Sequence, residues 1–259
     1  MSIEMSVITV CRNSAAVMPR MLETLRSQTW QAREWVVVDG GSTDGTQDLV
    51  AGSGERLGDW VSEPDAGIYD AMNKGWRRAR GDVLFFLNSD DALFDPGTLA
   101  AAAAAFEREP AAELAIGQVV YRFADGRMLL RDYHHLDAES LLFEDLCHQA
   151  VFARRSLFER IGGFNERFRI NADYDWLIRA LRAGAPVAWI DQPVAYFTTG
   201  GAHARNFAAL VAERHAVRLQ YLSSAHLTLG GLWRRAVGRT RRVFRLPAPG
   251  QRPFDPVTS

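Results

Sequence analysis

Two adjacent carboxylates, Asp90 and Asp91, directly follow an apolar run over residues 83–87. This run, Val-Leu-Phe-Phe-Leu, predicts a strand buried on both faces, which usually belongs to a parallel sheet covered by helices. In open α/β sheets, ligands bind just beyond the carboxyl ends of the strands. Carboxylate oxygens at such an edge suit Mg²⁺ or Mn²⁺, which can in turn hold a diphosphate. A solvated turn at residues 89–91 is the alternative interpretation.

Asp39 occupies a similar place after a second apolar run, residues 35–38. The small residues that follow it, 40–46, allow the backbone to approach a ligand closely. We therefore expect Asp39 to accept hydrogen bonds from a nucleobase or ribose. The alternative is that it caps the next helix.

Two further carboxylates, Asp173 and Asp175, open a helix later in the chain. Residues two apart do not share a helix face, so the two carboxylates are expected to have different partners. The helix dipole favours the ionised form of Asp173 near the helix start, which could be its entire role. Histidines also occur at 134–135 and at His148, but no Cys or further His has zinc-ligand spacing nearby, which favours a hydrogen-bonding or surface role.

The elements that must position these residues follow a strand and helix alternation in the first half. Ser14 is a plausible N-cap for a helix through about Ser27, and Asp95-Pro96 is a helix start. The turn after the first strand has no Gly-x-Gly-x-x-Gly, which disfavours a dinucleotide site. The expected strands are residues 5–10, 35–38, 60–65 and 83–87, and the expected helices are 14–27, 67–80 and one from 95 through the alanine run 100–105.

The second half has a different pattern. Residues 124–127, Ala-Asp-Gly-Arg, predict a hairpin turn between short strands at 119–121 and 128–130. A strand and a helix then follow within 149–158, strands are expected at 187–190 and 194–197, and a helix at 205–221. The fold class predicted is α/β: a Rossmann-like, mostly parallel sheet with helices on both faces, a small antiparallel portion and a C-terminal helical tail.

Composition limits the function classes. The chain has 259 residues, 47% of them hydrophobic, and a net charge of −1, so nucleic acid is not expected as a partner. Its two cysteines, Cys11 and Cys147, provide no disulfide framework and fit a reducing cytosol. The first residues lack the features of a signal peptide, and no stretch approaches the roughly 20 apolar residues of a membrane-spanning helix. A cytoplasmic location is expected.

The C-terminal segment 227–246 interleaves large apolar residues with arginines, and no acid lies between Arg234 and Arg245. This basic amphipathic pattern is typical of segments that lie on an anionic membrane surface. A solvated tail around a docked helix is the alternative. The expected organisation is a domain at 1–222, with halves 1–112 and 113–222, followed by the tail 223–259.

Several stretches together resemble family 2 glycosyltransferases of the GT-A fold. In order, these stretches are residues 7–10, 36–46, 65–75, 87–91, 148–152, 162–164 and 172–175. Their order along the chain, up to about Gly201, is harder to match by chance than any single motif.

The resemblance implies a UDP-, GDP- or dTDP-sugar donor and a divalent metal, Mn²⁺ or Mg²⁺. Asp173 matches the acid taken as the general base, with Ala172 replacing the Glu that usually precedes it. Asn88-Ser89-Asp90 matches the Asp-x-Asp signature, with Asn in place of the first acid. The donor-binding residues implied are Thr9, Asp39, Asp65, Lys74, Asn88, Ser89 and Asp90; the metal ligands are Asp90 and Asp91; the acceptor-side residues are His148, Gln149 and Asp175. His203 is expected as a further metal ligand on other grounds: it follows Gly200-Gly201 on a loop that could fold over the diphosphate, and His can ligate Mn²⁺. The family usually has a small hydroxyl residue near this place, and a surface histidine is the alternative.

The function expected is inverting transfer of one sugar to a saccharide or lipid-linked saccharide in surface polysaccharide synthesis, at the cytosolic membrane face. The Gln-x-x-Arg-Trp signature of processive synthases is absent. A metal-dependent nucleotidyltransferase is an alternative, although residues 11–14 do not form its Gly-rich basic loop. A non-catalytic nucleotide-sugar-binding module is another, although it would tolerate loss of Asp90 or Asp173, and both are present.

Overall fold

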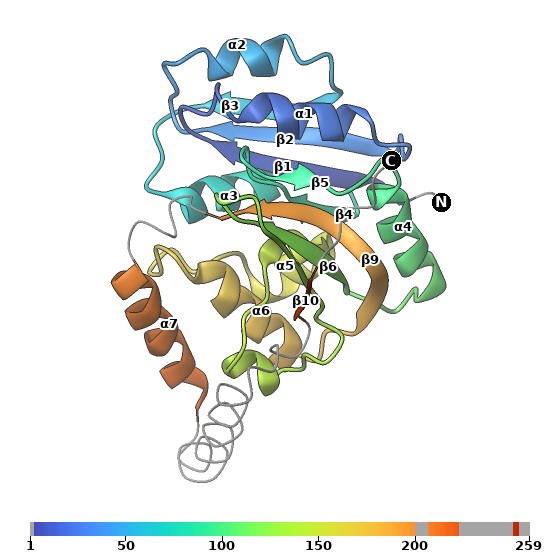
Figure 1. The fold of residues 1–259 in the computed structure, drawn as a ribbon, viewed down its shortest axis with the longest axis vertical. Helices are drawn as coiled ribbons and strands as arrows, with labels where there is room; N and C mark the ends of the chain where they lie inside the picture. Colours follow the sequence, from blue (N-terminus) through green and yellow to red (C-terminus); the bar gives the residue numbers. More distant parts are fainter. Residues whose placement is uncertain (1–2, 200–206, 223–250, 254–259) are drawn as a thin grey trace.

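The computed structural model describes residues 3–199, 207–222 and 251–253 (Figure 1). One half of its sheet is purely parallel, with neighbouring strands in the order β3-β2-β1-β4. The strands are β1 (Met5–Cys11), β2 (Arg33–Asp39), β3 (Leu57–Ser62) and β4 (Val83–Phe86). Every residue of β1, β2 and β4 is buried, as their near-continuous apolar runs predict.

Helices cover both faces of this parallel half. The side chains of Val7, Val37 and Phe85 pack on one face against α1 (Met18–Arg26) and α4 (Thr98–Arg108). Their neighbours along the strands point to the other face, where Tyr69 and Met72 of α3 (Ile68–Arg78) pack. The short helix α2 (Thr46–Ala51) follows β2. This alternation gives the molecule two apolar cores, one on each side of the sheet.

Antiparallel pairing is concentrated in the second half of the sheet. Strand β8 (Val151–Arg154) lies between β4 and β6 (Leu114–Arg122) and is antiparallel to both. Strand β6 also pairs with β7 (Met128–Arg131) in the predicted hairpin, with Val120 opposite Leu130. The remaining strands are β5 (Ala92–Leu93), β9 (Val187–Thr198), which pairs with β5 and runs parallel to β6, and β10 (Gln251–Pro253), which pairs with β7.

The helices of this half pack on the same face of the sheet as α3 and lie below β1, β2 and β3 in Figure 1. They are α5 (Arg155–Ile161), α6 (Ala172–Arg182) and α7 (Phe207–Tyr221), with short 3-10 turns at Ser140–Leu142 and His148–Ala150. Trp176 and Leu177 of α6 join the same core as α3. The predicted fold class is confirmed, and β4 stands where the two halves meet.

Some predicted boundaries were wrong. Helix α1 begins at Met18, so Ser14 is not its N-cap residue, although the Ser14 carbonyl accepts the amides of Val17 and Met18. The two late strands are one strand, β9, which stays paired to β6 across register shifts near Gln118. No helix within the described residues is long and apolar enough to cross a membrane.

Candidate active site

The loops after β1 and β2 are tied together at the carboxyl edge of the sheet. The Asn13 amide donates to the Ser42 hydroxyl at 2.7 Å, and the Thr43 amide donates back to the Asn13 side chain at 3.0 Å. The Ser14 amide donates to the Thr46 hydroxyl at 2.8 Å. The two loops therefore form one rigid rim beside the end of β4.

Asp39 holds this rim from beneath. Its carboxylate is fully buried and accepts hydrogen bonds from the Ser42 amide at 2.9 Å, the Ser42 hydroxyl, the Ser62 hydroxyl at 2.6 Å and the Cys11 thiol. Burial alone would raise the pKa of Asp39, but the hydrogen bonds from Ser42 and Ser62 lower it below its ordinary value. The structure thus gives Asp39 an organising role, and its contact with a nucleobase stays a prediction.

The other donor-side residues lie around the same rim. Thr9 is buried and accepts a hydrogen bond from the Trp35 indole at 2.9 Å. Asp65 approaches Gly40 so closely that an added Cβ there would collide with its carboxylate. Lys74 pairs with Glu63 at 2.9 Å and with Asp70 at 3.2 Å, and the hydrogen bond to Glu63 is the main cause of its raised pKa. Donor contacts by Thr9, Asp65 and Lys74 stay predictions.

The residues after β4 point in different directions. Ser89 is buried and donates to the Ser14 hydroxyl at 2.9 Å, which fastens this turn to the rim. Asp90 is partly exposed, and none of the described residues donates a hydrogen bond to its carboxylate. Asp90 therefore presents a charged, accessible carboxylate at the junction of the two halves.

Asp91 turns inward instead. It is almost fully buried and accepts hydrogen bonds from the Gln149 side chain and from the Thr198 amide, the latter at 3.1 Å. Burial, and then the nearby charge of Asp90, raise the pKa of Asp91 to about 7. Both Asp91 oxygens thus join the end of β4 to the antiparallel half, and its direct ligation of a metal stays a prediction.

His148 connects the two halves of the site. Its Nδ1 lies 2.9 Å from Oδ2 of Asp173, and its Nε2 lies 3.4 Å from Nδ2 of Asn88. Because the carboxylate accepts, the arrangement assigns the ring proton to Nδ1 and leaves Nε2 as an acceptor for the Asn88 amide. His148 was expected on the acceptor side, and the structure shows it joining Asn88 to Asp173.

Tyr69 is a site residue that sequence reasoning missed. Its hydroxyl lies 2.8 Å from Oδ1 of Asp173 and 2.7 Å from the Ile170 carbonyl, and the Tyr174 amide also donates to Oδ1 at 2.8 Å. Burial, reinforced by Asp173, raises the pKa of Tyr69 well above its ordinary value, so it stays a neutral hydroxyl. A Tyr in the first turn of a helix carries no signal of a partner 104 residues away.

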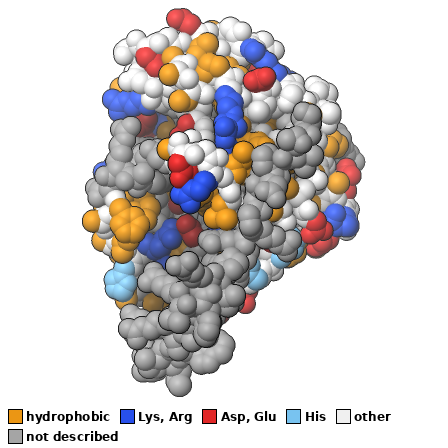
Figure 2. Space-filling model, viewed as in Figure 1, with side chains coloured by type: hydrophobic (Ala, Val, Ile, Leu, Met, Phe, Trp, Pro, Cys, Tyr) orange, Lys and Arg blue, Asp and Glu red, His pale blue; other side chains and the backbone are white. Residues whose placement is uncertain are grey.

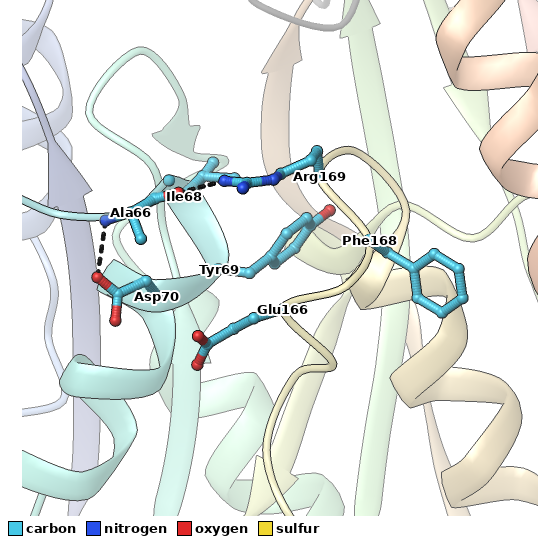
Figure 3. A pocket seen from close by; sticks show the side chains of 8 residues that line it. Ala66, Ile68, Tyr69, Asp70, Glu166, Phe168 and Arg169 are labelled. Carbon is cyan, nitrogen blue, oxygen red and sulfur yellow. Dashed lines mark hydrogen bonds between the residues drawn. The ribbon is translucent and has the colours of Figure 1, made fainter.

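Tyr69 also lines a pocket of about 120 Å³ at the start of α3 (Figure 3). Figure 3 shows Arg169 reaching across from the loop before α6 to the Ala66 carbonyl, and Asp70 accepting from the Ala66 amide. The Arg169 contact joins the start of α3, in the parallel half, to the loop that precedes Asp173.

Helix α7 fixes the position of that loop. The Glu213 carboxylate accepts three consecutive backbone amides, from Arg169 at 2.6 Å, Ile170 at 2.7 Å and Asn171 at 2.8 Å. The outer side of the helix is apolar: Figure 2 shows hydrophobic side chains on the surface over α7, where Phe207 is 72% exposed.

The remaining acceptor-side predictions fall on buried residues. Asp175 accepts hydrogen bonds from Arg179 at 2.9 Å and from the Tyr221 hydroxyl at 2.7 Å, and so ties α6 to α7. Gln149 is fully buried, with its amide divided between Asp91 and the Cys147 thiol. Their contact with an acceptor stays a prediction.

No group of three or more potential ligating side chains that could hold a metal occurs within the part of the chain that the structure describes. Asp90 alone offers an accessible carboxylate after β4, which fits a cation that takes most of its ligands from phosphates and water. His203 and the basic segment 227–246 lie outside the described residues.

A parallel sheet with carboxylates at its strand ends, faced by a His–Asp pair from an antiparallel half, defines a sugar transferase of the GT-A type. The sequence model of Glycosyl transferase family 2 matches residues 6–176, and the chain belongs to this family. The predicted resemblance is therefore confirmed, and the protein is a glycosyltransferase of glycoconjugate biosynthesis.

Relatives and solved structures agree with this assignment. The chain is 40% identical over 178 residues to a PGL/p-HBAD biosynthesis glycosyltransferase of Mycobacterium bovis, covering 67% of this chain and 68% of that protein. It is 34% identical over 207 residues to an uncharacterized glycosyltransferase of Mycobacterium tuberculosis, covering 76% and 77%.

Two solved structures share the fold. Staphylococcus aureus TarS 1–349 in complex with UDP-GlcNAc has a TM-score of 0.67 at 20% identity, over 86% of this chain and 69% of that one. The mannosyltransferase PcManGT from Pyrobaculum calidifontis, in complex with GDP-Man and Mn²⁺, has a TM-score of 0.60 at 20% identity, over 96% and 82%.

Proposed function

We propose that this glycosyltransferase moves one hexose-type sugar, with inversion, from a nucleotide sugar to a hydroxyl of a saccharide or lipid-linked saccharide. The observation that carries the proposal is the link through His148, which sets Asp173 opposite the turn that holds Asn88 and Asp90. Nucleotide sugars are bound by TarS and PcManGT, which share this fold. UDP-, GDP- and dTDP-sugars are the donors to test.

The residues divide the reaction between them. In an inverting displacement the acceptor hydroxyl attacks from the side opposite the departing diphosphate, so the base and the diphosphate site must face each other. Asp173 takes the acceptor proton as the new bond forms, while Tyr69 and His148 keep its carboxylate in place. Asn88 is available to hydrogen-bond the donor, and Asp90 would hold Mn²⁺ or Mg²⁺. The bound metal would supply positive charge for the departing diphosphate.

The first prediction tests the role of Asp90. Asp90→Ala should reduce release of nucleoside diphosphate from the correct donor by at least about 10³-fold, since a charge that stabilises the transition state is lost. The measurement is a screen of UDP-, GDP- and dTDP-sugars for diphosphate release, with Mn²⁺, with Mg²⁺ and with a chelator. Glu107→Ala, which removes an exposed carboxylate of α4, is the control. Full activity of Asp90→Ala in the presence of chelator would exclude a metal at this residue.

We also propose that the protein acts on the cytosolic membrane face, where the basic segment 227–246 binds anionic lipid and brings the site to a lipid-linked acceptor in surface polysaccharide synthesis. Six arginines lie between residues 234 and 245, and each contributes on the order of 1 kcal/mol near an anionic surface. Liposomes with and without anionic lipid should co-sediment the full chain but not residues 1–226, and salt should weaken the binding. Equal sedimentation of both forms would contradict membrane docking by this segment.

A further inference from the structure

A cavity of about 160 Å³ opens beside Asp173 on the antiparallel side of the site. His148 and Asp173, which the proposed reaction already uses, are among its lining residues. Its other walls come from elements far apart in sequence: Tyr121 of β6, Phe197 of β9, Asp145, and Leu210 and Arg214 of α7.

We propose that Leu210 and Arg214 of α7 select which acceptor sugar is bound in this cavity. This inference rests on the proposed function, because it places the attacking hydroxyl next to Asp173. The position is suitable since Asp173 and His148 both line the cavity, so a sugar ring bound there would have a hydroxyl within reach of the base.

The size of the cavity corresponds to one ring. A volume of about 160 Å³ is of the order of one sugar ring and is too small for a longer chain. The remainder of a longer acceptor would therefore lie outside. A terminal sugar is recognised, whatever carries it.

One wall of the cavity is aromatic. The rings of Tyr121 and Phe197 pack edge to face, with centroids 5.0 Å apart and an interplanar angle of 61°. Aromatic faces carry partial negative charge, and the C–H groups on a sugar ring are weakly positive. The C–H face of a sugar ring can therefore lie against this wall, as a fully hydroxylated face could not.

Other lining residues are polar and hold one another in place. Arg214 pairs with Asp145 at 2.7 Å, contacts Asn171 at 3.4 Å, and lies over the Tyr174 ring at 5.1 Å from its centroid. Its side chain is 20% exposed. The planar guanidinium offers donors in a fixed geometry, and Asp145 offers acceptors. This combination matches neighbouring hydroxyls on a sugar ring, and a flat hydrocarbon ring would leave these groups without partners.

The α7 residues Leu210 and Arg214 lie beyond the stretch that the family model matches. The family model ends at residue 176, whereas Leu210 and Arg214 belong to α7 at Phe207–Tyr221. The helix is held in register by Glu213 on one side and by the Tyr221–Asp175 hydrogen bond on the other. A rigid wall of this kind can differ between relatives while the donor-side motifs stay the same.

The test is a substitution that fills the cavity, compared with the same substitution at a neighbouring residue outside it. Leu210→Trp fills the cavity from α7, whereas Val211→Trp places the same side chain on the exposed side, where Val211 is 49% exposed. Saturation-transfer NMR on the full chain, with UDP or GDP and Mn²⁺ present, would measure binding of methyl glycosides of glucose, galactose, mannose, rhamnose and N-acetylglucosamine. We expect at least one glycoside to bind, Leu210→Trp to weaken it at least tenfold, as a pocket that loses its fit does, and Val211→Trp to leave it unchanged.

Arg214→Ala tests the polar side in the same way, with His215→Ala, an exposed neighbour, as its control. The affinity for the preferred glycoside should fall about tenfold and the discrimination among epimers should narrow, because a hydrogen-bonding partner is lost. The proposal is overturned if no glycoside binds, or if Leu210→Trp and Val211→Trp bind the preferred glycoside equally well. It is also overturned if phenol binds while every glycoside fails to bind, and Leu210→Trp abolishes the binding of phenol. If the wild-type protein bound no nucleotide, the result would instead count against the proposed function.

Discussion

In the parallel half of the molecule, polar side chains at the ends of β1 and β2 bind partners from the adjacent strand or loop, as Asp39 binds Ser42 and Ser62. In the other half, Asp173 is held by Tyr69, 104 residues away, and by His148, 25 residues away. The rim of the donor side is thus built by neighbouring loops, whereas the acceptor side exists only when distant elements meet. We therefore expect variants of the two halves to fail differently: the donor rim in stability, the acceptor side in turnover.

The largest effect that separates the halves is expected from Asp173→Asn. This change keeps the size of the side chain and removes its basicity, so turnover should fall roughly 10²–10⁴-fold while donor affinity stays near that of the wild type. Turnover and nucleotide affinity would be measured in parallel. Asp48→Asn, a first-turn acid of α2, is the matched control. A collapse of donor affinity with near-normal turnover would move Asp173 to a structural role.

His148→Ala should have the next largest effect. It removes the imidazole that bridges Asn88 and Asp173, so the base loses its orientation. Misplacement of a reacting group by about 1 Å can lower the rate on the order of 10²-fold. We expect kcat to fall and KM for the donor to stay unchanged. If KM for the donor rose and kcat stayed unchanged, His148 would belong to donor binding; His215→Ala is the control.

Glu213→Ala should show whether the two halves fail differently, because it loosens the loop before Asp173 without changing Asp173 itself. Three backbone amides before α6 would lose a charged acceptor, which costs about 1–3 kcal/mol. The melting temperature should fall by roughly 2–4 °C for each kcal/mol in a chain of this size. Turnover should fall more than nucleotide affinity. Gln220→Ala, exposed on the same helix, should change neither.

The smallest effect on chemistry is expected from Asp39→Asn, which tests the donor rim. Because hydrogen bonds lower the pKa of Asp39, its carboxylate stabilises the fold above the unfolded-state pKa of about 3.9, and this stability is lost as the pH falls through the lower native pKa. The variant should unfold more easily by about 1–3 kcal/mol at pH 7. The difference should shrink below about pH 4. Urea unfolding at several pH values checks this, and a constant difference at all pH values would contradict it.

The sequence predicted the parallel half well, because its information is local. The apolar runs of β1, β2 and β4 have a length and composition that few other structures accommodate. The residues that end these strands were therefore placed correctly at one edge of the sheet. In the antiparallel half, the Asp-Gly turn at residues 125–126 is similarly local and fixes the hairpin.

Around Asp173, the sequence predicted individual residues but not the contacts between them. Asp173 and His148 were both singled out, yet nothing in their spacing indicates that they meet, and Tyr69 and Glu213 were not singled out at all. Burial was also not visible: Asp39 and Asp175 have their carboxylates fully engaged inside the protein. Strand β9 was divided in two because residues 191–193 resemble a turn, whereas pairing with β6 continues past them.

The contact of Glu213 with the amides before α6 has a consequence for synthesis of the chain. Ile170 leaves the ribosome 43 residues before Glu213. At about 5–20 residues per second, this interval lasts roughly 2–9 s. The nascent protein can complete its donor-side sheet in that time, but the turn that carries Asp173 lacks its carboxylate partner. The order of translation thus builds the parallel half first and completes the surroundings of Asp173 last.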